Sequence, residues 1–464
     1  DLGHIDTFRT EEGRILEAAI AAITGGDCAR ARDWAEECTG EVSFWLSRDQ
    51  RRKIAWSLVT DAACLGCLLD EHPRPFDGLS GFDDAVEIYA DKASAVDRAH
   101  RVFEQRRANL LGPHLPHFLK LKEAVDAVRR RHAAWADDLA RDFSALCRTK
   151  GLLPDERLQQ RHVYDQVIHP LAQGGERTAV FLVDALRHEM AVELAEEIRS
   201  AAPGGTKVKL SARFAELPTI TPVGMNAVAP VAKDGRLDLA GKKSFKGFCT
   251  GEFTVDGPEN RARAMGQRST GEKALSLGLD EVCETDPATL KNRVVQKQLV
   301  VVHDKVIDDA GEAGVGVDSF EQRLSRIKAA WHHLESAGVS RFVITSDHGF
   351  LLVDGSKEPR PYGKKTDPSR RHVLAAEPRR EDGLLTVSLA ELGYAGRKGY
   401  LLFTEDTTVF DTGERAETFV HGGNSPQERI VPVLVVTSKT RPNVSLSAYR
   451  VVAAGVLMLA MIPE

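Results

Sequence analysis

An apolar run of strand length that leads directly into an amphipathic helix pattern constrains the fold of this chain most strongly. The run TAVFLVD (178–184) is followed by LRHEMAVELAEEIRSA (186–201), in which apolar residues repeat at helical spacing. Strands that are apolar on both faces and alternate with helices are typical of a parallel sheet covered by helices. Further segments with strand character lie at 207–215, 298–304, 340–347 and 429–437. We therefore expect an α/β fold whose sheet is mainly parallel and flanked by helices.

The residues before this fold show a different pattern. Apolar residues recur at three- and four-residue spacing through Ile15–Ile23, Ile54–Leu69, Ala85–Leu111 and Phe118–Leu146, which predicts helices. No fixed-period repeat is evident, so a bundle and a solenoid both remain open. We expect an all-helical region over 1–170, the α/β domain over 171–440 with a Gly-, Lys- and Arg-rich loop insertion at 231–275, and the start of a possible C-terminal β module, cut short, at 441–464.

Composition limits the class of protein. A chain of 464 residues is too long for one ordinary core, and 42% hydrophobic with 28% charged residues is typical of a soluble protein. A net charge of −6 gives no general attraction to nucleic acid or anionic membrane. The seven cysteines are scattered and odd in number, which favours a reducing compartment. No N-terminal signal is visible, and the apolar stretch Val451–Pro463 is too short to span a bilayer. We expect a cytoplasmic protein without membrane association.

Two of the expected strands end in a carboxylate, Asp184 and Asp347. Ligands of open α/β sheets bind beyond the carboxyl ends of the strands, so these side chains are expected to converge. His348 follows Asp347 directly, and two carboxylates with an imidazole suit Zn²⁺ or Mn²⁺ better than Ca²⁺. The alternatives are structural: Asp184 could simply cap the next helix, and Asp-His-Gly could form an ordinary turn.

A hydroxyl nucleophile is offered by LPTITP (217–222), where Thr219 and Thr221 are the candidates. A threonine hydroxyl attacks poorly at neutral pH unless a divalent cation stabilises its alkoxide. The amides at the start of a helix expected at 222–229 would favour a phosphoryl group. The alternative is a loop that contains two threonines without a chemical role.

A second cation would need its own ligands. Asp308 and Glu312 in IDDAGE (307–312) are four residues apart, which places them on one face of a helical turn. His421 in VHGGNSP (420–426) could complete the set, or it could be an ordinary loop histidine. Two ions about 4 Å apart would stabilise the attacking and leaving oxygens of an in-line displacement.

These segments carry a family resemblance. In order and context, VDALRHEMAVELAEEI, LPTITPVGMNA, VVHDKVIDDAGE, VITSDHGFLL and HGGNSPQERIVPVLV resemble the PglZ family of the BREX phage-resistance systems, within the alkaline phosphatase superfamily. The resemblance covers about 177–437. It implies one metal site formed by Asp184, Thr221, Asp347 and His348, with Thr221 as the nucleophile because related phosphodiesterases use the second threonine of a similar turn. A second site would comprise Asp308, Glu312 and His421. It implies one or two divalent ions, with Zn²⁺ favoured and Mn²⁺ or Mg²⁺ as alternatives.

One departure stands out, because many superfamily members have a histidine where this chain has Glu312. A carboxylate there puts two-metal catalysis in doubt. The resemblance implies a component of a bacterial antiviral defence system that works with other BREX proteins. Its expected activity is that of a metal-dependent phosphohydrolase, a phosphodiesterase or nuclease, with DNA as a candidate partner. The alternatives are a catalytically silent scaffold of the defence complex, or a small-molecule phosphatase or phosphomutase.

Basic residues beside these motifs suggest anion contacts. Arg187 could reach a phosphate oxygen, or it could pair with a glutamate on the helix surface. The segment 356–372 is strongly basic and includes Lys364, Lys365, Arg370 and Arg371. Such a loop could hold a nucleic-acid backbone, or it could simply be solvated.

Overall fold

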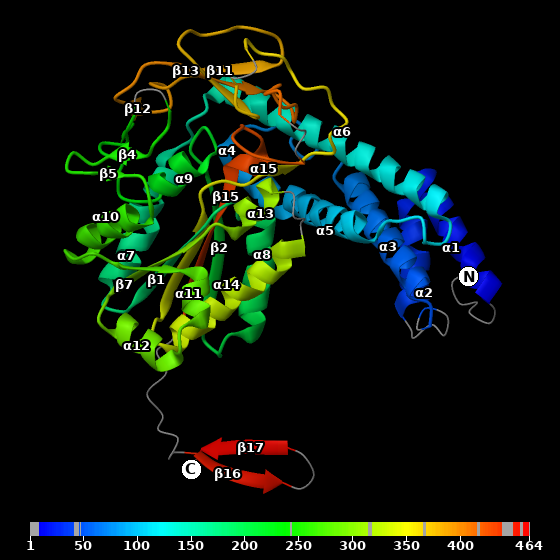
Figure 1. Cartoon of the computed structure of the whole chain (residues 1–464), viewed down its shortest axis with the longest axis horizontal. Helices are drawn as coiled ribbons and strands as arrows, with labels where there is room; N and C mark the ends of the chain where they lie inside the picture. Colours follow the sequence, from blue (N-terminus) through cyan, green and yellow to red (C-terminus); the bar gives the residue numbers. More distant parts are fainter. Residues whose placement is uncertain are drawn as a thin grey trace.

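The computed structural model describes residues 9–40, 46, 48–241, 244–313, 318–364, 368–414, 418–438, 449–454 and 458–463. A helical region lies at one end of the molecule and an α/β sheet at the other (Figure 1). Within these ranges, no helix is long and apolar enough to cross a bilayer.

The helical region packs around large buried side chains such as Trp56, Phe103 and Phe143. Helix α2 packs against α3, and α3 in turn against α5 and α6. Helix α3 begins after Asp49, whose carboxylate accepts a hydrogen bond from the amide of Arg51 and so caps the helix. The helices are α1 (Arg9–Thr24), α2 (Cys28–Gly40), α3 (Gln50–Glu71), α4 (Phe82–Ile88), α5 (Ser94–Leu110) and α6 (Phe118–Lys150), with the π-helical turn η2 (Tyr89–Ala93) between α4 and α5.

Short helical segments lead from this region to the main sheet. They are η3 (Glu156–Leu158), η4 (Gln160–His162), η5 (Tyr164–Ile168) and α7 (His169–Gln173). The sheet has the strand order β2-β15-β8-β1-β7-β6. Its strands are β1 (Thr178–Val183), β2 (Lys207–Phe214), β6 (Leu275–Gly278), β7 (Leu299–Asp304), β8 (Arg341–Ser346) and β15 (Ile430–Thr437). Strands β6, β7, β1 and β8 pair in parallel, while β15 runs antiparallel to both β8 and β2. The prediction of a mainly parallel α/β sheet is confirmed.

Strand β1 is buried on both faces, and its alternate residues belong to two different cores. Phe181 and Val183 pack with helices α8 (His188–Ala201) and α14 (Asp318–Ser336). Val180 and Leu182 belong to a core that continues into the helical region. Each face of the sheet is therefore covered, which explains why the run 178–183 is apolar without alternation. Shorter helices complete the cover: α11 (Leu279–Glu284), α12 (Pro287–Val295) and α13 (Val306–Glu312).

Smaller β elements lie beyond the main sheet. Strands β10 (His372–Ala375), β13 (Tyr400–Thr404) and β11 (Leu384–Ser388) form an antiparallel sheet. Two-stranded pairs are β9 (Leu351–Leu352) with β14 (Phe419–Val420), β3 (Leu237–Asp238) with β12 (Tyr394–Ala395), β4 (Phe248–Cys249) with β5 (Thr254–Val255), and β16 (Tyr449–Ala454) with β17 (Met458–Pro463). Helices α9 (Thr221–Ala227) and α15 (Pro426–Arg429) flank the site described below.

The insertion 231–275 is more ordered than the sequence suggested. Helix α10 (Pro258–Thr270) occupies part of the predicted loop and packs on β6 and β7. Its buried residues include a charged side chain among small and apolar ones, and they are Arg261, Ala262, Ala264, Met265 and Gly266. The prediction of a loop was therefore wrong for this segment, because its apolar periodicity is weak.

Buried charges join the helical region to the α/β half. Arg187, at the start of α8, has its Nη2 3.0 Å from Oδ2 of Asp97 on α5. Arg101 on α5 places its Nε 3.0 Å from Oε1 of Glu189 and its Nη2 2.8 Å from Oε2 of Glu193 on α8. An ion pair removed from water stabilises only if both partners stay in place. These contacts therefore fix the orientation of α5 against α8.

Candidate metal centre

The carboxyl ends of two adjacent strands bring Asp184, Asp347 and His348 together. Asp347 and His348 are completely buried, and Asp184 nearly so. The Nε2 atom of His348 lies 3.6 Å from Oδ1 of Asp184 and 3.3 Å from Oδ2 of Asp347. We call these three residues the deep group. Asp184 does not cap α8, because Arg187 occupies the N-cap position without a side-chain cap bond.

Backbone geometry fixes the deep group. Oδ1 of Asp347 accepts hydrogen bonds from the amides of Ala185, at 3.1 Å, and of His348, at 2.9 Å. Ala185 adopts a φ of 58°, a left-handed conformation that is uncommon for alanine and directs its amide to Asp347. A Cβ at Gly224 of α9 would lie 2.3 Å from the carbonyl oxygen of Asp347. Glycine at 224 therefore lets α9 approach the deep group closely.

Thr221 is the hydroxyl that faces the deep group. Its Oγ1 lies 3.4 Å from Oδ1 of Asp184 and 3.4 Å from Nε2 of His348. Thr219 is fully buried, donates to the carbonyl of Gly423 at 2.8 Å and accepts from the amide of Gly422 at 3.1 Å. Thr219 therefore holds the loop that carries His421, and this role separates the two threonines that the sequence left as candidates.

Asp308, Glu312 and His421 form a second group closer to solvent, which we call the rim group. The Nε2 atom of His421 lies 3.5 Å from Oδ1 of Asp308 and 3.4 Å from Oε1 of Glu312. The Nδ1 atom of His421 is 3.1 Å from the carbonyl oxygen of Thr219, which orients the ring. The side chain of Glu312 is 58% exposed. Ile220, Arg370 and His372 line a cavity of about 470 Å³ beside this group.

The two groups touch through their histidines. The rings of His348 and His421 stack with centroids 4.3 Å apart and an interplanar angle of 9°. Ligand atoms of Asp184, Asp347 and His348 all lie within 4.8 Å of one another, and so do those of Asp308, His348 and His421. His348 is therefore close enough to both groups to be shared between them.

The electrostatics of this cluster favour a bound cation. Burial, with the charges of Asp347 and Asp308, raises the pKa of Asp184 well above its usual range. Burial also raises the pKa of Asp308 to about 7 and lowers the pKa of His348 to about 4. Within the described residues, Oδ2 of Asp347 and Oδ1 of Asp308 have no hydrogen-bond partner. Buried carboxylates around a neutral imidazole, with free oxygen atoms, fit a divalent cation in donor type.

His421 has the opposite pKa shift from His348. Burial alone would lower it, but the hydrogen bond to Glu312 and the charge of Asp308 raise the pKa of His421 to about 9. The same hydrogen bond lowers the pKa of Glu312. Without a cation, the rim group is therefore held together by a protonated imidazole.

Two of the predicted anion-binding arginines are buried in ion pairs. Arg187 is completely enclosed, pairs with Asp97, and lies over the ring of Phe350 with its Cζ 5.0 Å from the centroid. Arg371 is also fully buried and contacts the carboxylate of Glu428 through Nε at 3.3 Å and Nη2 at 3.1 Å. The structure therefore gives both a structural role, because neither guanidinium is available to an external phosphate.

The remaining basic residues differ in position. Arg370 lines the cavity beside the rim group, and its Nη2 lies 3.9 Å from Glu414. Lys364 is exposed on the surface, and Lys365 lies outside the described residues. Arg370 is thus the predicted anion contact that the structure places beside the candidate centre.

Sequence reasoning missed the residues that support the His421 loop. Glu428 accepts hydrogen bonds from the amides of Gly423, at 2.7 Å, and Ser425, at 3.1 Å, while it pairs with Arg371. Ser425 and Glu428 form a capping box at the start of α15. The Ser-x-x-Glu spacing was visible in the sequence and could have indicated this turn.

A family model described as "BREX system PglZ alkaline phosphatase-like domain" matches residues 163–436. This chain belongs to the PglZ family. The match contains every residue of the deep and rim groups, together with the main sheet except the last residue of β15. The expected alkaline-phosphatase-like fold is therefore confirmed.

Two curated relatives of this PglZ-family chain have low sequence identity to it. The alkaline phosphatase-like protein PglZ of Bacillus cereus is 22% identical over 364 residues, which cover 76% of this chain and 41% of the relative. The alkaline phosphatase-like protein BrxZ of Escherichia coli is 21% identical over 459 residues, which cover 94% of this chain and 51% of the relative. The chain thus spans about half the length of these relatives or less.

Solved structures with partial similarity include human ectonucleotide pyrophosphatase/phosphodiesterase 5 and a phosphonoacetate hydrolase from Sinorhizobium meliloti. The former has a TM-score of 0.35 at 10% identity and covers 56% of this chain and 88% of its own. The latter has a TM-score of 0.34 at 12% identity and covers 56% of this chain and 89% of its own.

Proposed function

We propose that this chain is the hydrolase part of a BREX defence protein and cleaves a phosphoester with Thr221 as nucleophile. The observation that carries the proposal is the position of the Thr221 hydroxyl, 3.4 Å from both a carboxylate and an imidazole of the deep group. A divalent cation held by Asp184, Asp347 and His348 would supply the Lewis acidity that a threonine needs to react at neutral pH. Zn²⁺ is the ion we favour, with Mn²⁺ or Mg²⁺ as alternatives.

The protein residues divide the remaining work. Oδ1 of Asp184 is placed to accept a hydrogen bond from Thr221 and so to orient its oxygen towards phosphorus. Thr219, through Gly422 and Gly423, keeps His421 over the site. Asp308, Glu312 and His421 would hold a second ion, which would stabilise developing charge on the leaving oxygen.

The charge of the rim group favours a diester. A phosphate monoester carries close to two negative charges at neutral pH, while a diester carries one. Glu312 adds a carboxylate where the superfamily often has a neutral histidine, so the more highly charged substrate is repelled more strongly. The two buried arginines offer it no compensation, because they pair with Asp97 and Glu428. We therefore place a phosphodiester, with DNA as one candidate, ahead of a small monoester.

The biological setting follows from the family. We propose that the chain works with other BREX proteins in antiviral defence, since the matched family is named for that system.

An assay of metal content and hydrolysis tests the proposal. We expect purified wild type to bind at least one Zn²⁺ or Mn²⁺ per chain and to cleave bis-p-nitrophenyl phosphate faster than p-nitrophenyl phosphate. Thr221→Ala should lose diesterase activity while keeping the ion, and Thr221→Ser should retain part of the activity because it keeps a hydroxyl. Activity in Thr221→Ala equal to wild type would refute the nucleophile.

A second candidate function is a catalytically silent scaffold of the defence complex. The exposed Glu312 in the rim group favours it, because a solvated carboxylate paired with a protonated His421 weakens the second cation site. In that case the same assay would give less than one bound ion per chain and equal background hydrolysis in wild type and Thr221→Ala.

A further inference from the structure

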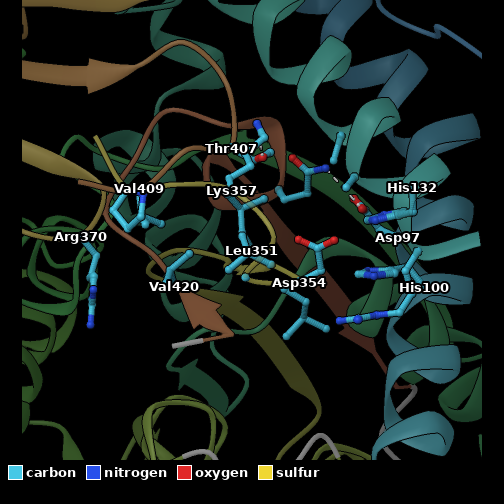
Figure 2. Close-up of a pocket in the computed structure, with 18 of the residues that line it drawn as sticks. Asp97, His100, His132, Leu351, Asp354, Lys357, Arg370, Thr407, Val409 and Val420 are labelled. Atoms are coloured by element: carbon cyan, nitrogen blue, oxygen red, sulfur yellow. Dashed lines mark hydrogen bonds between the residues drawn. The ribbon is translucent and has the colours of Figure 1, made fainter. Parts of the chain in front are cut away.

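A second cavity, which we call the junction cavity, lies where helices α5 and α6 meet the α/β half. Its volume is about 160 Å³. His100 and His132 lie on one side of it and Arg370 on the opposite side in Figure 2. Arg370 and Val420 line both this cavity and the cavity beside the rim group. The junction cavity is therefore a neighbour of the candidate centre, but it contains none of the deep or rim residues.

Much of the cavity wall is apolar. Ala133 and Ala136 of α6 face Leu351, Val409 and Val420 from the α/β half. An apolar wall of this kind favours the carbon faces of a ligand over free ions. The occupant should therefore be an organic molecule rather than an inorganic ion.

A pair of stacked histidines forms the polar part on the helical side. The rings of His100 and His132 lie 3.4 Å apart at an angle of 11°. Both side chains are buried, and no described residue makes a hydrogen bond with Nε2 of His132. Burial lowers the pKa of both imidazoles well below the usual range, so each is neutral. A neutral imidazole offers one donor and one acceptor.

Gln427 of α15 adds an unpaired acceptor to the cavity wall. Its Nε2 donates to Oδ1 of Asp97 at 3.3 Å, but its Oε1 has no hydrogen-bond partner among the described residues. Gln427 is 2% exposed. Buried polar atoms without partners are rare in folded proteins and often mark the place of a ligand or water.

Charge around the cavity is balanced. Four acidic residues, Asp97, Asp354, Asp411 and Glu414, and four basic residues, Arg129, Arg187, Lys357 and Arg370, line it. Several already pair with each other or with neighbours: Arg187 with Asp97, Arg370 with Glu414, and Lys357 with Asp406. The cavity therefore does not select a phosphate or another anion.

We propose that the junction cavity binds one small neutral heterocycle whose edge carries both hydrogen-bond donors and acceptors, as in a free purine or pyrimidine base. Its carbon face would lie against Ala133, Leu351 and Val420, and its polar edge would meet His132 and Gln427. This pattern distinguishes the ligand from a hydrocarbon, which leaves the polar atoms unpaired, and from an anion, which the balanced charge of the wall does not favour.

Binding to the metal-free chain tests this site independently of hydrolysis. The probes are adenine, hypoxanthine and uracil, and inorganic phosphate and benzene are the comparators. Isothermal calorimetry measures the binding of each compound, and thermal unfolding measures its effect on Tm. We expect at least one base to bind with one site per chain and to raise Tm, and neither comparator to match it at equal concentration. The proposal is overturned if no base binds, or if benzene or phosphate binds as well as the best base.

Two substitutions that fill the cavity test whether the base binds there, and a substitution at a neighbouring exposed residue is the control. Ala133→Leu adds volume from α6, and Val353→Phe adds it from the α/β half; both positions are only partly buried, so the larger side chains can be accommodated. Each variant should lower the affinity for the best-binding base at least tenfold. Ala134→Leu on the exposed side of the same helix should leave the affinity unchanged. Equal affinity in wild type and in a folded filling variant would overturn the assignment. Because no metal is present, either result leaves the proposed hydrolase untouched.

Discussion

The deep and rim groups use similar ligand types in very different surroundings. In the deep group, Asp347 and His348 are fully buried and the backbone amides of Ala185 and His348 fix one carboxylate oxygen. In the rim group, Glu312 is more than half exposed, and its link to His421 is a single contact of 3.4 Å. A preorganised site needs less reordering when a cation binds. The deep candidate site is therefore built into the sheet, whereas the rim candidate site depends on a helix end and a loop.

The largest expected effect is loss of the deep site. Asp347→Asn keeps the size of the side chain but removes the charge that faces His348. We expect bound metal to fall below one ion per chain. We also expect kcat/KM for a diester to fall roughly a thousandfold, which corresponds to a loss of about 4 kcal/mol in transition-state stabilisation. Metal analysis and kcat/KM measure both. Retained metal and activity would show that the deep group is not the main site.

A smaller effect is expected at the rim. His421→Asn removes one ligand of the more exposed group, so we expect roughly a hundredfold loss of kcat/KM with the deep ion still bound. Glu312→His is the paired variant, because it introduces the residue that many superfamily members carry at this position. It should increase the affinity of the rim group for the second ion. If His421→Asn abolishes binding of both ions, the two groups are not separable.

Loss of the hydrogen bonds that hold the His421 loop should have a smaller effect than loss of a rim ligand. Thr219→Val keeps the shape but removes the hydroxyl that contacts Gly422 and Gly423. We expect about a tenfold loss of rim-ion affinity, in line with partners that orient metal ligands. Thr219→Ser keeps the hydroxyl and is the control. A loss as large as that of Thr221→Ala would point to a catalytic role for Thr219.

The two histidines should also differ in how they respond to pH. The pKa of His421 is about 9 without metal, above its ordinary value, so its proton must leave when a cation binds. Rim-ion affinity should therefore rise by at most tenfold per pH unit between pH 7 and pH 9, where His421 alone loses a proton, and level off above pH 9. Below pH 7 it should rise more steeply, because Asp308 then also carries a proton. The pKa of His348 is about 4, so its imidazole adds no such dependence above pH 5. Zinc calorimetry in buffers of different ionisation enthalpy counts the protons, and His421→Asn should release about one fewer.

Much of the fold was predictable because strand and helix periods are local properties. The runs that became β1, β7, β8 and β15 were recognised by their largely continuous apolar residues. The segment that became β2, KVKLSARF, was also predicted, although polar residues interrupt its apolar ones. Strand β6 was missed because its four residues, LSLG, lie at the sheet edge and are only partly buried. Helix α10 was missed because charged residues interrupt its apolar face.

The sequence predicted only those parts of the candidate site whose positions follow from the strand topology. The rule that ligands lie beyond strand ends led to Asp184 and Asp347 without any knowledge of distance. No local pattern reveals that Arg187 meets Asp97 or that Arg371 meets Glu428, because such pairs depend on how distant segments pack. For the same reason the residue pattern by itself could not separate Thr219 from Thr221, and only the family resemblance favoured Thr221.

The ion pairs between α5 and α8 have a consequence for how this molecule can be divided. A shortened chain that started at β1 would leave Arg187 and Glu189 without Asp97 and Arg101. It would also expose Val180 and Leu182, whose core continues into the helical region. Both losses fall on the half that carries the candidate catalytic residues, so we expect that half to unfold at a lower temperature when it is produced alone.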